Sequence, residues 1–350
     1  MVVYLVMLVL SCFGGWLSTK MKDSNGKIFA FTLTFIPLFL VSGLRFEVGQ
    51  DYTTTYVYTF ERILNGYSNI RMDLGFFYLN KLVAFFSGSS QWIFVITSFI
   101  INYYICKSIF EKSSNKFLSI FIYICGTLFF FSLNGVRQAI AMSLFYYSLK
   151  YIEEKNLKKY FITNLVGFLF HNSAIIFFPL YFILNKRFKT TIKIAIIGIM
   201  IFISPLLLNY ISRILLSTKY AMYITNGAYS PLEFINVSTV INILLFALYE
   251  LYYKKQEKND SKYNMYSNIH FIGILVSVFM TKISLVIRIF MYFRYIEFLS
   301  VPYLLSKIKM NKKLYYIVVI VVLITYFVYF IHGVYIENGN TVLPYHSIFS

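Results

Sequence analysis

Residues 129–155 read "FFFSLNGVRQAIAMSLFYYSLKYIEEK", a stretch that joins one apolar run to the next across a short polar hinge. Asn134-Gly135 turns the chain, and Arg137 and Gln138 follow at the start of the next helix. An arginine near a helix N-terminus adds to the positive end of the helix dipole, which is unfavourable unless an anion binds there. The hinge therefore indicates an anion site at the mouth of a membrane segment. The alternative is an arginine that only snorkels to the membrane interface.

The composition around this hinge is that of a membrane protein. The chain has 350 residues, of which 59% are hydrophobic and only 13% are charged, whereas a soluble domain needs about 25% charged residues. The formal net charge of +18 lies in short basic clusters between apolar runs, which is typical of the positive-inside pattern and argues against a nucleic-acid partner. The composition predicts an all-α polytopic integral membrane protein.

Apolar runs of about 17–25 residues can cross a bilayer. Eight such runs lie near 2–18, 28–44, 91–107, 117–133, 194–216, 236–253, 266–287 and 314–333. Two shorter runs, 137–151 and 292–306, cross only if the bilayer thins or flanking residues snorkel. We therefore expect about ten transmembrane helices in one domain, 1–350, with the basic clusters in the cytoplasm.

This arrangement places both termini, the loops 45–75 and 217–235, and the C-terminal tail 334–350 on the outer face. Within the outer-face region 45–90, the segment 76–88 is read as an interfacial or re-entrant helix. The protein is expected in the cell inner membrane, as a multi-pass protein with its active face toward the periplasm or outside.

The apolar segment 160–184 has to enter and leave on the cytoplasmic side if the charge rule holds. It is long enough for one crossing, or for two half-length helices that are broken near His171 and Asn172. The charge rule favours the broken hairpin, because irregular backbone is tolerated at membrane depth where it lines a cavity.

Charged side chains near spans cost about 2.5–3.5 kcal/mol on insertion scales, so each needs a partner or a purpose. Arg45 follows a span and is either an anion ligand or a snorkelling arginine paired with Glu47 or Asp51. Arg288 and Tyr292 are four residues apart and share one helix face. His171 is either a hydrogen-bonded structural residue or a general base near pH 7.

No cofactor and no metal are expected. The four histidines are scattered without ligand spacing, and the three cysteines lie singly in apolar segments. A phosphate-binding glycine loop and a GxSxG nucleophile elbow are both missing from the sequence.

With these residues in view, the chain resembles the EpsG/Wzy family of polysaccharide polymerases. The matching stretches, in order, are "SGLRFEVGQDYTTTY", "LNGVRQAIAMSLFYYSLKYI", "FLFHNSAIIFFPLY", "IRIFMYF" and "NTVLPYHSIF". The pattern N-x-x-R-Q followed later by a histidine is the most specific part. The segment 76–88 departs from the family, which often has a clearer helix there.

The resemblance implies that undecaprenyl-pyrophosphate-linked oligosaccharides serve as donor and acceptor on the outer leaflet. Joining them would build O-antigen, capsule or exopolysaccharide and release the lipid pyrophosphate carrier. Membrane lipid, a flippase and a chain-length regulator are the implied partners. The implied roles are pyrophosphate binding by Arg137, Arg288 and Arg45, proton removal by His171 or Asp51, and substrate orientation by Asn134, Gln138 and Tyr292.

Three other functions are alternatives to polymerisation. A flippase or transporter of lipid-linked oligosaccharide would also use arginines, but the halves of the chain show no repeated broken helices. A glycan ligase differs mainly in its acceptor. An acyltransferase would need an acidic partner for its histidine, and no carboxylate neighbours His171 in the sequence.

Overall fold

The computed structural model describes residues 1–67, 69–70, 72–216, 221, 236–252, 260–280 and 285–349. The structure is 79% helical. Among the described residues, extended pairing is limited to one isolated antiparallel bridge between Arg45 and Ser347. The predicted all-α fold class is confirmed.

The chain forms two compact units. The first comprises Met1–Phe178 and Glu297–Ser350, and the second comprises Pro179–Ile296. The elements of the first unit are α1 (Val2–Leu17), α2 (Ser24–Gly43), the π-helix η1 (Tyr52–Val57), α3 (Tyr58–Leu64), α4 (Leu74–Phe86), α5 (Gln91–Lys112), α6 (Lys116–Cys125), α7 (Leu128–Asn134), α8 (Val136–Glu153), α9 (Leu157–Phe170), the 3₁₀-helix η2 (Asn172–Ile176), α16 (Glu297–Lys307), α17 (Lys312–Phe330) and the π-helix η4 (Ile331–Ile336).

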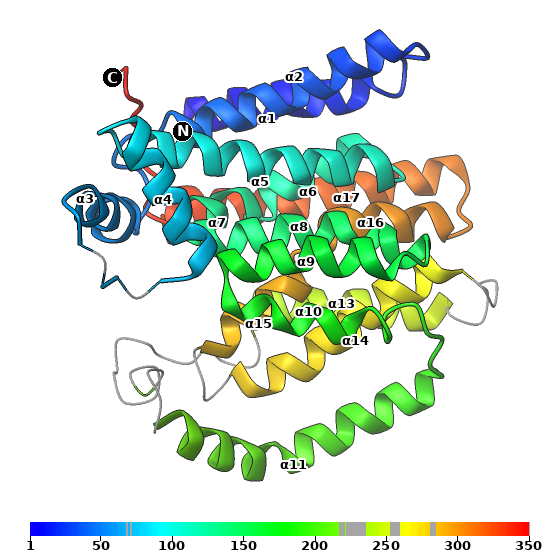
Figure 1. The fold of residues 1–350 in the computed structure, drawn as a ribbon. Coiled ribbons are helices and arrows are strands. Elements are labelled where there is room, and N and C mark those ends of the chain that lie inside the picture. Colours follow the sequence, from blue (N-terminus) through cyan, green and yellow to red (C-terminus); the bar gives the residue numbers. More distant parts are fainter. Residues whose placement is uncertain are drawn as a thin grey trace. The chain divides into compact units, whose positions relative to one another are not determined.

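The second unit contains α11 (Thr190–Leu216), α13 (Val237–Tyr252), α14 (Ser261–Met280) and α15 (Leu285–Arg294), and the short α10 (Phe177–Leu180) lies at the boundary (Figure 1). The predicted outer loop 217–235 lies outside the described residues except for residue 221. That this loop faces outward, and that the chain is one functional domain, stay predictions.

Four of the described helices are long and apolar enough to cross a membrane. They are Ser24–Gly43, Gln91–Lys112, Thr190–Ile214 and Lys312–Ile336, and the bent pair α6–α7 would make a fifth crossing. The predicted count of about ten is not confirmed. One physical reason is length, because α1 and α13 have only 16 residues each, whereas a bilayer core of about 30 Å needs about 20.

Helix α8, which carries most of the stretch quoted at the start, is not counted as a membrane-crossing helix for a different reason. Of its 18 residues, 13 are buried, and it packs against α5, α7 and α9 (Figure 1). A Cβ on Gly167 of α9 would lie only 3.3 Å from the Cα of Ala141, so the two helices are in close contact. Protein rather than lipid surrounds α8, which is why a run that is short and polar for a membrane-crossing helix forms the centre of this unit.

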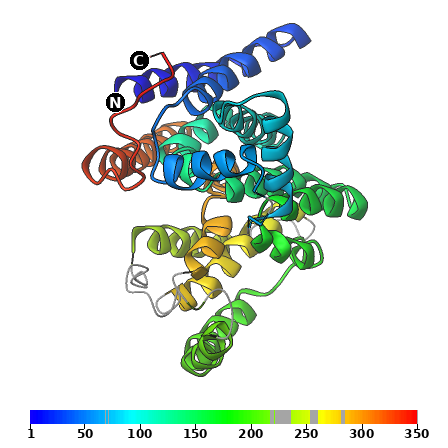
Figure 2. The same ribbon diagram turned by 60° about the vertical axis from the view of Figure 1, so that its left-hand side comes forward.

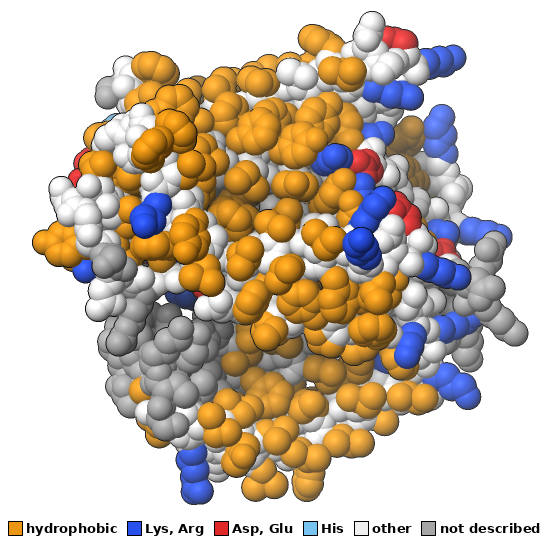
Figure 3. All heavy atoms as spheres, viewed as in Figure 1, with side chains coloured by type: hydrophobic (Ala, Val, Ile, Leu, Met, Phe, Trp, Pro, Cys, Tyr) orange, Lys and Arg blue, Asp and Glu red, His pale blue; other side chains and the backbone are white. Residues whose placement is uncertain are grey.

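Ion pairs join the helices at one end of the first unit, and a side-chain hydrogen bond joins them at the other. At one end, Lys112 pairs with Glu153 at 3.2 Å and Lys150 pairs with Glu111 at 2.8 Å, which joins the ends of α5 and α8. Lys and Arg side chains gather toward this end, and hydrophobic side chains cover the middle of the helices (Figure 3). At the opposite end, Gln91 Nε2 at the start of α5 donates to the Gly43 carbonyl at 2.6 Å.

The segment after α8 forms the predicted broken hairpin. Helix α9 ends at Phe170, and His171 adopts extended backbone (φ −154°, ψ 114°) before η2. The chain then doubles back, since Tyr160 Oη near the start of α9 donates to the Phe177 carbonyl at 2.7 Å. The chain thus breaks near His171, where the sequence predicts it. The second limb is a 3₁₀-helix followed by the four-residue α10 rather than a second half-length helix, and entry and exit on the cytoplasmic side stay a prediction.

The C-terminal tail packs on the loop that follows α2. The Phe46 N–H donates to the His346 carbonyl and the Gly49 N–H donates to the Thr341 carbonyl, both at 3.0 Å. Both ribbon views show this tail beside the start of α1 (Figures 1 and 2). The tail therefore closes the end of the first unit at which α8 begins.

Candidate functional site

An ion pair between Arg137 and Asp73 lies where the starts of α4 and α8 meet the end of α9. Arg137 Nη1 donates to Asp73 Oδ2 at 2.8 Å, and the two side chains are 28% and 8% exposed. Arg137 is the second residue of α8, and Asp73 directly precedes α4. Because a guanidinium carries five N–H donors, Arg137 can hold Asp73 and still present donors to a second anion.

His171 faces the same carboxylate. Its Nδ1 atom lies 3.6 Å from Asp73 Oδ2, which is longer than a hydrogen bond. On the other carboxylate oxygen, Asp73 Oδ1 accepts the backbone N–H of Asn172 at 3.3 Å. The break after α9 thus supplies both an imidazole and a main-chain donor to Asp73. We call Asp73, Arg137 and His171 the charged triad.

Gly75 allows α4 to come close enough to α9 for these contacts. A Cβ at this position would lie 2.9 Å from the carbonyl oxygen of Leu169, closer than side chains approach backbone in folded proteins. Leu169 is two residues before His171 and Gly75 is two residues after Asp73, so the close approach fixes the distance between Asp73 and His171.

Replacing Gly75 with alanine is expected to push the start of α4 away from α9. Overpacking of this kind costs about 1–3 kcal/mol, so thermal unfolding of the purified protein in detergent should begin at a lower temperature. Gly88→Ala is the matched control, because nothing lies within 4 Å of a Cβ there. Equal stability of the two variants would contradict the proposed close contact.

Tyr56 of η1 links several predicted site residues. Its hydroxyl donates to the Asn134 carbonyl and accepts the Val136 N–H at 3.0 Å, which ties η1 to the start of α8. Burial raises the pKa of Tyr56 to about 12, against the opposing charge of Arg137 and with a small addition from Asp51. Tyr56 therefore stays protonated as a hydroxyl at neutral pH, with Arg137 and Asp51 both within electrostatic reach.

Asn134 acts as a clamp within the protein. Its Nδ2 donates to the Asn340 carbonyl of the tail at 2.8 Å, and its Oδ1 accepts the Asp51 N–H at 3.3 Å. The predicted role of Asn134 in orienting substrate stays a prediction, since its side-chain amide already joins the tail to the loop before η1.

Arg45 is 2% exposed and lies beneath the loop. Its Nη1 donates to the Ser42 carbonyl at 2.9 Å, and its Nη2 donates to the Leu133 carbonyl at 2.8 Å. Its guanidinium also lies over the ring of Phe94. These contacts favour a role for Arg45 in holding the end of α7, and we leave it out of the proposed anion site.

Three further predicted site residues are Gln138, Arg288 and Tyr292. Gln138 is buried in α8. Arg288 is exposed on α15, and Tyr292 on the same helix is buried. Both belong to the second unit, so the expectation that Arg288 and Arg137 bind one diphosphate stays a prediction.

The Asp73 carboxylate is the electrostatic centre of the charged triad. Burial by itself raises the pKa of Asp73, but His171, Arg137 and the Asn172 N–H lower it by more, so that the pKa lies below the ordinary value of 3.8. Asp73 is therefore ionised at neutral pH and able to orient His171.

The lowered pKa of Asp73 implies that the stability of the protein depends on pH. A carboxyl group whose pKa is lower in the folded protein stabilises the fold at pH values above its unfolded pKa of about 3.9. This stabilisation is lost as the pH falls through the pKa of the folded state. We expect wild type to unfold at a higher temperature than Asp73→Asn at pH 7, with the difference shrinking below about pH 4. A difference that does not change with pH would contradict this account of the charged triad.

Asp73 was missed by sequence reasoning. It lies 98 residues before His171 in the chain and three residues before the predicted interfacial segment 76–88. The usable signal was an acidic residue at the start of an apolar helix, a common N-terminal pattern. The argument that His171 lacks a carboxylate partner, used against an acyltransferase, is wrong for this reason.

The described residues include no group of three or more His, Cys, Asp or Glu side chains arranged to hold a metal ion. The charged triad contains one carboxylate and one imidazole together with a guanidinium, which repels cations. Its donor set suits an anion rather than a metal.

An all-helical fold with membrane-length apolar helices defines this chain as an integral membrane protein. The chain belongs to the EpsG family, which matches residues 28–347 and consists of polysaccharide polymerase-like membrane proteins. The resemblance noted from the sequence is thereby confirmed, and all three residues of the charged triad lie within the match. No curated protein sequence and no solved structure matches the chain.

Proposed function

We propose that this protein is a membrane glycosyltransferase that joins undecaprenyl-pyrophosphate-linked oligosaccharides into a polysaccharide on the outer face of the cell inner membrane. The observation that carries the proposal is the charged triad. It places a candidate base, His171, near a cation, Arg137, that can stabilise the negative charge of a departing diphosphate. Family membership supports a role in polysaccharide biosynthesis. The type of donor and the outward orientation are part of the proposal.

In the proposed reaction, a hydroxyl oxygen of the acceptor sugar attacks the anomeric carbon of the donor glycan. The bond between that carbon and the diphosphate oxygen breaks, and the electron pair leaves with the lipid diphosphate. The proton of the hydroxyl passes to the enzyme and then to water. Each turnover forms one glycosidic bond and releases one polyprenyl diphosphate, so the donor itself supplies the driving force.

His171 is the proposed base. Its Nδ1 atom faces the Asp73 carboxylate, so the Nδ1–H tautomer is favoured and Nε2 is left to accept the proton of the sugar. A carboxylate that holds an imidazole in one tautomer has the same role in hydrolase triads. The distance of 3.6 Å is compatible with this role, because catalytic hydrogen bonds often shorten only when substrate binds. Asp51 stays an alternative base.

Arg137 is the proposed ligand of the diphosphate. Its guanidinium is partly exposed, and its planar donor fork matches phosphate oxygens. Gly135, which precedes α8, provides no capping side chain, so the positive end of this helix also favours an anion. Arg288 is a proposed second ligand from the other unit.

Deletion of the gene tests polymerisation against flipping. A strain without the polymerase should display surface glycan of a single repeat in place of a ladder, and the wild-type gene should restore the ladder. Accumulation of single repeats on the cytoplasmic side would indicate a flippase and contradict the proposal.

A further inference from the structure

One side of α4 carries an apolar stripe that begins beside the charged triad, and the exposed Lys81 lies at its edge. Leu74, Tyr78, Leu82 and Phe85 recur at spacings of four, four and three residues, and each side chain is more than half exposed. Positions at this spacing lie on one face of a helix. The stripe starts at Leu74, next to Asp73, and runs to the end of α4.

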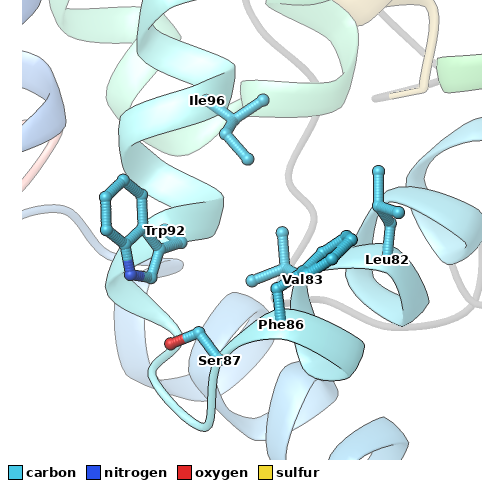
Figure 4. A pocket seen from close by; sticks show the side chains of 6 residues that line it. All are labelled: Leu82, Val83, Phe86, Ser87, Trp92 and Ile96. Carbon is cyan, nitrogen blue, oxygen red and sulfur yellow. The ribbon is translucent and has the colours of Figure 1, made fainter.

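At its far end the stripe reaches a groove between α4 and the start of α5. The groove has a volume of about 400 Å³. Its lining residues are Leu82, Val83, Phe86, Ser87, Trp92 and Ile96 (Figure 4). In the close-up, Trp92 and Ile96 of α5 lie across from the α4 side chains. Ser87 is the one polar residue of the lining, so an apolar chain fits here and a sugar does not.

We propose that this groove, called here the tail groove, binds the polyisoprenyl chain of the lipid diphosphate whose head group lies at Arg137. The inference rests on the proposed function for the identity of the head group. Leu82 to Phe86 lie 9–13 residues beyond Asp73, which along a helix is about 14–20 Å. A long polyisoprenyl chain covers this distance along the stripe, whereas the three isoprene units of a farnesyl chain do not fill the groove.

A polyisoprenyl chain fits better than the acyl chains of a phospholipid. Leu74, the first residue of the stripe, follows Asp73, which pairs with the partly exposed Arg137. A single chain with its anionic head at Arg137 could therefore follow the stripe into the tail groove. A phospholipid brings two chains side by side from one glycerol, and one of them would be left outside the path. Aromatic side chains at Phe86 and Trp92 also offer flat surfaces to a methyl-branched chain.

Trp92 provides a direct probe, because the chain contains only two tryptophans. The other, Trp16, lies on α1 and stacks on Phe13, so Trp16→Phe leaves Trp92 as the single reporter. In detergent, undecaprenyl diphosphate should change the Trp92 emission saturably and bind about tenfold more tightly than farnesyl diphosphate. No saturable change, or equal affinity for the two diphosphates, would overturn the inference.

Phosphatidylglycerol with brominated acyl chains tests whether bilayer lipid, rather than a polyisoprenyl chain, occupies the tail groove. We expect any quenching of Trp92 by this lipid to be reversed by undecaprenyl diphosphate. Quenching that undecaprenyl diphosphate does not reverse would mean that the tail groove holds bilayer lipid, and would overturn the inference.

A second variant tests the tail groove during turnover. Ser87→Phe places a ring in the groove and should lower the preference for a donor with an undecaprenyl tail over a donor with a farnesyl tail. Val321→Phe, at an exposed position on α17, is the matched control and should keep the wild-type preference. An unchanged preference in Ser87→Phe would overturn the tail groove.

The two proposals fail in different ways. Polymerisation by a protein whose Trp92 does not respond to undecaprenyl diphosphate would overturn the tail groove alone. A normal Trp92 response in a protein that forms no glycosidic bond would support the tail groove and overturn the polymerase.

Discussion

Replacing His171 with alanine is expected to lower the rate of glycan transfer about 100- to 10,000-fold, which is the usual contribution of a general base. The variant loses the group that accepts the proton of the sugar, while the Arg137–Asp73 ion pair and the Asn172 contact stay in place. The protein should therefore still insert and fold. The measurement is the rate of chain elongation with purified wild type and variant at equal concentrations in membrane.

His332→Ala is the matched control for this prediction. His332 also faces a carboxylate, with its Nδ1 atom 3.5 Å from Glu337, but the two side chains are 57% and 60% exposed. Its loss should leave elongation near the wild-type rate. A His171→Ala protein that elongates glycan as fast as His332→Ala would eliminate His171 as the base and leave Asp51 as the candidate.

Replacing Arg137 with alanine is expected to lower the transfer rate about 100- to 1,000-fold, as is usual when one donor to a developing negative charge is removed. Arg137→Lys should retain part of the rate, because it keeps the charge but loses the planar fork. Arg62→Ala removes an arginine of α3 whose guanidinium lies over the rings of Tyr58 and Tyr67, and should have little effect. Elongation and protein stability are to be measured in parallel.

The double variant Arg137→Ala/Asp73→Ala separates a catalytic role from a structural one. Removing both charges relieves the unpaired carboxylate that the single Arg137→Ala variant leaves behind, so stability should recover. Transfer should stay low, because neither the diphosphate ligand nor the residue that orients His171 is present. Recovery of transfer together with stability would show that Arg137 serves only to neutralise Asp73.

Much of the first unit was predictable from local pattern. The gathering of Arg45, Asp51, Asn134 and Arg137 at one end followed from hydrophobic run lengths and the spacing of basic clusters. The break at His171 followed from the charge rule, because a segment long enough for one crossing had to enter and leave on the same side. Both inferences depend on which segments lie in lipid and which in water, and the hydropathy and charge of each residue indicate this directly.

The number of crossings was not predictable in the same way. Helix α8 packs against several other helices, so Ser143, Tyr146 and Ser148 lie in protein rather than in lipid. Hydropathy measures the fit of a segment to lipid and does not reveal that a helix is enclosed. For this reason the sequence predicts only a marginal membrane span at 137–151, although this segment forms a buried central helix.

The role of Asp73 depends on tertiary contacts that local sequence does not carry. Its partners Arg137, His171 and Asn172 come from α8 and from the break after α9. His171 and Asn172 meet Asp73 because the missing side chain of Gly75 lets α4 approach α9. Arg45 is a second case, since the sequence left open an anion ligand or a snorkelling arginine, whereas the buried guanidinium donates to carbonyls of α2 and α7.

The most direct test of the central claim uses the purified protein in liposomes with one synthetic undecaprenyl-pyrophosphate-linked repeat unit. Released polyprenyl diphosphate and new glycosidic bonds are counted in the same reaction. The charged triad as a transferase site predicts one lipid diphosphate released for each bond formed, with both products falling together in His171→Ala and Arg137→Ala. Movement of the intact lipid-linked sugar across the bilayer without bond formation would contradict it.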